Sequence, residues 1–117
     1  MHPNVRIYYN PACSKCRQSK ALLDDRGEQL DIVEYLTTPP GRDELVHILG
    51  LLNLEPRELM RRHEAPYAAL QLDRAELSRD QLIDAMVDHP ILIERPIVIK
   101  NGKAIIGRPP ERILDIL

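Results

Sequence analysis

The 117-residue sequence contains no tryptophan and no phenylalanine, and tyrosine occurs only four times. We therefore expect a hydrophobic core built from Leu, Ile, Val, Ala and Met. No apolar run approaches the ~20 residues of a membrane span, and the first ten residues lack the apolar stretch of a secretory signal. These absences predict a cytoplasmic protein without a membrane partner.

An excess of positive charge is also missing. The formal net charge is −2, with 29% charged and 44% hydrophobic residues. A general nucleic-acid surface would need a cationic excess, so no nucleic-acid partner is expected, although a local basic pocket remains compatible with this charge. The length fits a single domain over residues 1–117 that can bury a core without disulfides or metals.

Cysteine is scarce as well: Cys13 and Cys16 are the only two. A structural zinc ion needs about four Cys or His ligands. The histidines are scattered without the spacing of a zinc site, which argues against a metal centre; they are His2, His47, His63 and His89. In a reducing compartment the two cysteines should be thiols rather than a structural disulfide.

The first forty residues indicate a β-α-β unit. The run "VRIYY" at residues 5–9 predicts a strand, and residues 30–36 predict a second one. Between them, Ser14 is a candidate N-cap for a helix that should stop at Gly27. This order favours a parallel strand pair with a crossover helix.

Helical patterns fill the middle of the chain, from about residue 41 to 89. In "GRDELVHILGLL" the apolar residues recur at helical spacing, and Pro56 suits the first turn of another helix. Ser78 and Gln81 form a capping-box pattern for a third helix that should end before Pro90.

Asn101-Gly102 lies between two apolar runs and predicts a type I′ hairpin over residues 96–107, followed by a short helix. The element order therefore predicts an α/β protein with a four-stranded mixed sheet. This is the thioredoxin-like fold, with a helical insertion at about 41–89 between N-terminal β-α-β and C-terminal β-β-α parts.

The cysteine pair falls where the first strand meets the first helix. A helix N-terminus offers free N–H groups and a positive dipole end, and Lys15 and Arg17 add charge. These features favour a reactive thiolate at Cys13. Cys16, one turn on, is either a resolving thiol or a buried structural one, and two ordinary thiols at a helix start remain the simpler alternative.

Arginines flank the predicted hairpin. Arg95 precedes Pro96 at its entrance, and Arg108 follows its exit. In a thioredoxin-like sheet the proline at this position lies beside the active thiol and is often cis, so Arg95 should point toward Cys13. Guanidinium groups gathered at a thiolate match tetrahedral oxyanions, whereas a single surface arginine is usually only solvated.

Five segments carry a resemblance over nearly the whole chain: "IYYNPACSKCR", "YLTTPPGRDEL", "LMRRHEAPY", "HPILIERPIVI" and "GRPPERILDIL". The sequence resembles the glutaredoxin-coupled arsenate reductase (ArsC) family of the thioredoxin superfamily. The resemblance implies that Cys13 is the nucleophile and that three arginines bind the oxyanion; they are Arg61, Arg95 and Arg108. Arg17 falls at a basic position of the motif, and Arg62 competes with Arg61 for its role.

The resemblance further implies reduction of arsenate to arsenite, with glutathione as co-substrate and glutaredoxin or thioredoxin as partner. No tightly bound cofactor or metal is implied, and we expect a monomer. Two positions depart from the family. Tyr9 occupies a position where many members have His, and Cys16 occupies one where many have Ser or Thr. A CxxC pair also occurs in Spx-type regulators. There are therefore two alternatives: a redox-sensing regulator that binds RNA polymerase, and a glutathione-dependent reductase of another substrate.

Overall fold

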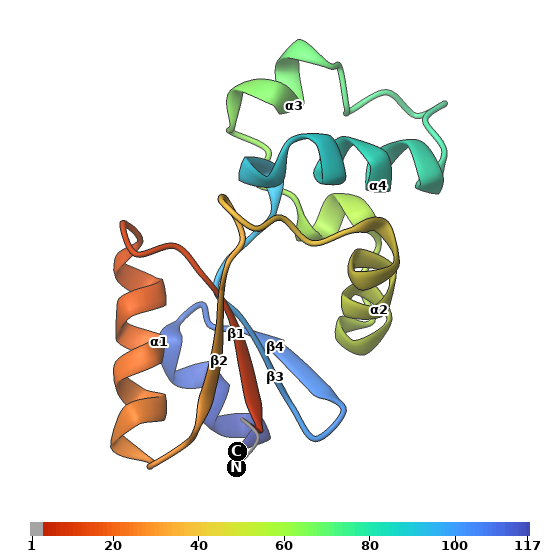
Figure 1. Cartoon of the computed structure of the whole chain (residues 1–117). Helices are drawn as coiled ribbons and strands as arrows, with labels where there is room; N and C mark the ends of the chain where they lie inside the picture. The colour runs from red at the N-terminus through yellow and green to blue at the C-terminus, as the bar shows by residue number, and fades with distance from the viewer. Residues whose placement is uncertain (1–3) are drawn as a thin grey trace. The chain divides into compact units, whose positions relative to one another are not determined.

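The computed structural model describes residues 4–117, which form two compact units. The sheet unit comprises residues 4–38 and 95–117, and the helical unit comprises residues 39–94 (Figure 1). None of the helices within residues 4–117 combines the length and apolar character that crossing a bilayer needs.

The sheet unit contains four strands in the order β2-β1-β3-β4. The central pair is β1 (Val5–Tyr9) and β3 (Ile97–Lys100), with β2 (Leu30–Glu34) and β4 (Lys103–Ile106) at the edges. β1 pairs parallel with β2 and antiparallel with β3, and β3 pairs antiparallel with β4. The mixed four-stranded sheet is confirmed.

Helix α1 (Ser14–Asp25) and the 3-10 helix η3 (Pro110–Ile116) pack against each other (Figure 1). Both contribute to one buried cluster on a single face of the sheet, since the cluster also includes alternate residues of β1 and their neighbour in β3. Its members are Val5, Ile7, Leu23, Val98 and Ile113. Burying each such side chain contributes about 1.5–3 kcal/mol, so this cluster holds α1 to the sheet.

The predicted hairpin is present. Asn101 and Gly102 both have positive φ, 52° and 74°, as a type I′ turn requires. The predicted second strand is shorter than expected, because the N–H groups of Thr37 and Thr38 both bond to the carbonyl of Glu34 and turn the chain.

The helical unit contains α2 (Arg42–Leu52), α3 (Ala65–Ala69) and α4 (Arg79–Asp88), with 3-10 turns η1 (Pro56–Leu59) and η2 (Pro90–Leu92). α2 packs against α4, and their apolar faces are buried. The predicted capping box of Ser78 and Gln81 is formed. The sequence did not predict α3.

The helix predicted after Pro56 is only one turn, η1, because the next residue, Met60, adopts an extended conformation. Met60 forms an antiparallel bridge with Ile93, and the Glu94 N–H bonds to the Leu59 carbonyl.

Core composition also differs from the prediction: Tyr8 and Tyr35 are fully buried among the aliphatic residues. The Tyr8 side chain has a hydrogen-bond partner in Arg6, as buried tyrosine hydroxyls usually do.

Candidate functional site

Cys13 is the N-cap residue of α1, with extended backbone angles, and its carbonyl accepts from the Arg17 N–H at 3.1 Å. The prediction that Ser14 caps the helix is wrong, since Ser14 is its first helical residue. The preceding loop fixes this register. Asn10 accepts from the Ala12 N–H through its side chain at 3.0 Å, and from the Cys13 N–H through its carbonyl at 2.9 Å.

The Cys13 thiol is buried, with 7% of the residue exposed. Burial acts to raise its pKa. The backbone N–H and side chain of Cys16 and the positive charge of Arg95 together outweigh burial, so the pKa of Cys13 lies below its ordinary value. The Nη2 atom of Arg108 also lies 3.7 Å from Sγ. A thiolate is the nucleophilic form of cysteine, so this environment favours reaction at Cys13.

Cys16 lies in α1, is fully buried and, like Cys13, is a free thiol. Burial, together with the neighbouring Cys13, raises the pKa of Cys16 to about 12 against the opposing effect of the Asn10 backbone. At neutral pH Cys16 is therefore a protonated thiol beside a more acidic one. As such it can donate a hydrogen bond to the Cys13 sulfur.

Two of the predicted arginines meet the thiol within the sheet unit. Arg95 precedes Pro96 through a cis peptide bond, as the thioredoxin-like pattern predicts; Arg108 precedes a second cis proline, which the sequence analysis did not foresee. The Nε of Arg108 donates to the carbonyl of Arg95 at 2.7 Å. The two side chains therefore bring guanidinium charge from both ends of the β3–β4 hairpin to Cys13.

Arg17 has a different environment. It is exposed on α1, and its Nη1 donates to the carbonyl of Pro11 at 2.9 Å. The side chain therefore ties α1 to the loop that precedes Cys13. No local sequence pattern indicates this contact.

Arg61 lies in the helical unit, where its side chain is largely buried against two carboxylates. Its Nη1 donates to Glu64 at 2.7 Å, its Nε lies 3.7 Å from Glu94, and its Nη2 lies 3.1 Å from a ring nitrogen of His63. Arg62 is exposed, and its Nη2 lies 3.4 Å from the Arg57 carbonyl oxygen. The two acidic partners of Arg61 were not singled out from the sequence.

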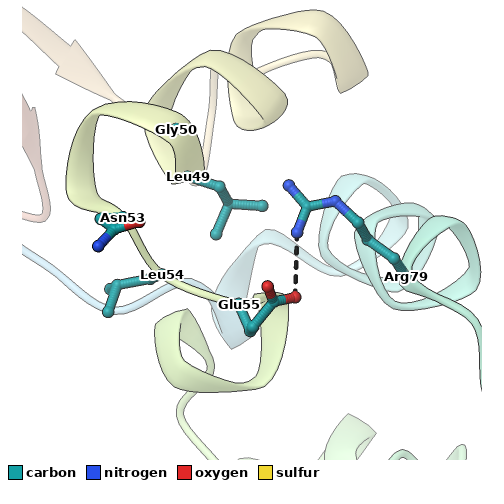
Figure 2. A pocket seen from close by; sticks show the side chains of 6 residues that line it. All are labelled: Leu49, Gly50, Asn53, Leu54, Glu55 and Arg79. Carbon is teal, nitrogen blue, oxygen red and sulfur yellow. Dashed lines mark hydrogen bonds and ion pairs between the residues drawn. The ribbon is translucent and has the colours of Figure 1, made fainter.

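Within residues 4–117 no group of three or more His, Cys, Asp or Glu side chains has the arrangement of a metal site. His2, considered above as a ligand, lies outside the described residues. The helical unit contains a hollow of about 430 Å³, crossed on one side by an ion pair between Glu55 and Arg79 at 3.1 Å (Figure 2). It is lined by Leu49, Gly50, Asn53, Leu54, Glu55 and Arg79, none of which was a predicted site residue.

The profile of the ArsC family matches residues 8–116. The chain is 48% identical to an Escherichia coli protein named "Uncharacterized protein YfgD", over 100% of this chain and 99% of that one. It is 46% identical to an arsenate reductase of Neisseria meningitidis, covering 98% and 99% of the two chains. A solved structure titled arsenate reductase from Vibrio cholerae is 47% identical, covers 100% of both chains and superposes with a TM-score of 0.96. The fold is thus thioredoxin-like, and the chain belongs to the ArsC family.

Proposed function

We propose that this protein is an arsenate reductase, which reduces arsenate to arsenite through Cys13 with glutathione and glutaredoxin as electron donors. The observation that carries the proposal is the buried Cys13 thiol at the N-cap of α1, with its pKa lowered and the Arg108 guanidinium 3.7 Å away. The names of the Neisseria and Vibrio relatives support arsenate as the substrate.

In this scheme the arginines bind the oxyanion. Guanidinium groups keep their charge at any relevant pH and can offer paired hydrogen bonds to a tetrahedral anion. Arg95 and Arg108 converge on the sulfur that attacks, so they offset the negative charge of both reactants. The resemblance adds Arg61 and Arg17 as further anion-binding candidates.

The reaction balances as two thiol oxidations against one two-electron reduction of arsenic. The Cys13 thiolate attacks arsenic, a sulfur–arsenic bond forms, and one arsenate oxygen is protonated and leaves as water. The thiolate of glutathione then attacks the Cys13 sulfur. The sulfur–arsenic bond breaks with its electron pair on arsenic, which leaves as arsenite. A glutaredoxin thiolate then attacks the glutathione sulfur of the Cys13–glutathione disulfide, which frees the Cys13 thiolate, and a second glutathione removes the glutathione from glutaredoxin as glutathione disulfide.

Cys16 has a supporting role in the same scheme. Since its thiol stays protonated and buried, it stabilises the Cys13 thiolate by a hydrogen bond instead of attacking the mixed disulfide. The helix end, Cys16 and Arg95 together replace the His that many family members carry at the position of Tyr9. Glutathione is a co-substrate, and no bound metal or organic cofactor enters the scheme.

The test is arsenate-dependent NADPH oxidation with glutathione, glutaredoxin and glutathione reductase present. We expect turnover by the natural sequence and none by Cys13→Ser, which keeps the size of the side chain but removes the sulfur. Phosphate and sulfate should compete with arsenate without being reduced. Turnover that persists in Cys13→Ser would refute the proposal. Absence of turnover in the natural sequence, with a reactive Cys13, would favour a reductase of another substrate.

A further inference from the structure

Gly107, at the exit of β4, has no space for a side chain. A Cβ atom placed on it would lie 2.6 Å from the Ser19 hydroxyl oxygen, 2.9 Å from Cγ of Pro96 and 3.2 Å from Cγ2 of Ile113. Real Cβ atoms essentially never lie within 3.0 Å of such neighbours. Three elements therefore close on this glycine more tightly than any other residue would allow.

Two of these elements, and the segment of Gly107 itself, also carry a part of the site. Ser19 belongs to α1, whose N-cap is Cys13. Pro96 is joined to Arg95, and its carbonyl accepts from the Gly107 N–H at 2.9 Å. Gly107 itself is followed by Arg108. A displacement at Gly107 is thus transmitted directly to the helix that holds the thiol and to the backbone that holds both guanidinium groups.

Ser19 completes the contact from the helix side. It is fully buried, and its hydroxyl has no hydrogen-bond partner among the described residues. An unsatisfied buried hydroxyl is unfavourable, so polarity does not account for this residue. Its small size does, because any longer side chain would push α1 away from the end of the hairpin.

We propose that the contact between Gly107 and Ser19 is a positioning device that sets the distance of the Cys13 thiol from Arg95 and Arg108. The contact lets α1 approach the hairpin ends closely enough for Arg108 to lie 3.7 Å from the sulfur. It thereby fixes how strongly both arginines favour the thiolate. The consequence for arsenate reduction rests on the proposed function, but the consequence for the thiol does not.

The test measures Cys13 directly. The rate of alkylation by iodoacetamide, followed across pH by mass spectrometry of the cysteine peptide, reports the fraction of thiolate. We expect Gly107→Ala to move this profile to higher pH and to slow alkylation near neutral pH by about three- to tenfold, where tenfold corresponds to one pKa unit. The double variant Gly107→Ala with Ser19→Ala, which removes the nearest clashing atom, should recover part of the loss.

Gly50→Ala is the matched control, because a Cβ at Gly50 would meet nothing within 4 Å. Its alkylation profile should equal that of the natural sequence. A folded Gly107→Ala protein whose profile is unchanged, even with a lowered melting temperature, would overturn the proposal. If Gly107→Ala does not fold, Ser19→Thr enlarges the contact from the helix side, and an unchanged profile in that variant would overturn it equally. If the natural sequence shows no arsenate turnover, that result would count against the proposed function and not against the positioning role of Gly107.

Discussion

The Arg108 guanidinium is held between two partners: its Nε donates to the Arg95 carbonyl at 2.7 Å, and its Nη2 lies 3.7 Å from the Cys13 sulfur. One edge of the planar group is therefore anchored to the backbone while another faces the thiol. Because the anchor comes from the residue before Pro96, both ends of the hairpin contribute to the position of one charge. Such preorganised charge is effective because it needs no rearrangement when the anion binds.

Replacing Arg108 with Ala should weaken anion binding and raise the pKa of Cys13. Hydrogen bonds to charged groups contribute about 1.5–3 kcal/mol, which corresponds to roughly a tenfold or larger rise in KM for arsenate. The measurement is steady-state kinetics combined with the pH profile of Cys13 alkylation. Arg112→Ala is the control, since Arg112 is an exposed arginine of η3. Equal kinetic constants in the two variants would contradict the role of Arg108.

The buried Cys16 thiol should make the protein lose stability in alkaline solution. Its pKa is raised to about 12 in the folded chain, against about 8.5 in the unfolded chain. Its stabilising contribution is therefore complete below about pH 8.5 and is lost as the pH rises toward 12, because the unfolded chain then binds fewer protons. The loss is up to about 1.4 kcal/mol per pH unit.

This loss can be measured by urea unfolding at several alkaline pH values, with Cys16→Ala as the comparison. The natural sequence should show the steeper fall in the free energy of unfolding, since Ala has no proton to release. Parallel curves for the two proteins would mean that Cys16 ionises normally in the folded state.

Two serines that look alike as helix caps in the sequence should differ in their effect on stability. Ser78 accepts a hydrogen bond from the Gln81 N–H at 3.1 Å, and the Gln81 side chain accepts from the Ser78 N–H at 2.8 Å. Ser14 is not a cap, because Cys13 holds that position. We expect Ser78→Ala to cost about 1 kcal/mol and Ser14→Ala much less, as measured by thermal unfolding. An equal loss in both variants would show that capping by Ser78 adds nothing.

Local signals explain why much of the fold could be predicted. The Asn101-Gly102 turn and the Ser78 capping box depend on neighbouring residues, so short patterns reveal them. The position of the cap at Cys13 depends on hydrogen bonds that Asn10 accepts from the Ala12 and Cys13 N–H groups, so the helix begins one residue earlier than predicted.

Long-range contacts account for what the sequence did not reveal. The approach of Ser19 to Gly107 joins residues far apart in the chain, and no spacing rule indicates it. The short η1 turn has the same origin, because pairing of Met60 with Ile93 ends it. The cysteine and arginines of the site could be identified from motifs, whereas the packing contacts that hold them in position could not.

The state of Cys16 during turnover can be distinguished by trapping intermediates. With Cys16 protonated and buried, the Cys13–glutathione disulfide should be released by glutaredoxin and not by Cys16. Turnover by Cys16→Ser should then depend on glutaredoxin as it does in the natural sequence. Mass spectrometry of acid-quenched samples gives the readout. A Cys13 mixed disulfide that accumulates only in Cys16→Ser would instead identify Cys16 as the resolving thiol.

Two roles for Arg17 can be distinguished by experiment: holding the loop that precedes Cys13, and binding the anion. Its Nη1 donates to the Pro11 carbonyl at 2.9 Å. Loss of the contact in Arg17→Ala should loosen the loop, so the rate of Cys13 alkylation without arsenate should change. Gln18→Ala, an exposed neighbour on α1, is the control and should leave this rate unchanged.

If Arg17 acts only on the anion, alkylation without arsenate will match the natural sequence while KM for arsenate rises. The Pro11 contact leads us to expect the first result, since a side chain engaged by the loop must release it before it can bind the anion.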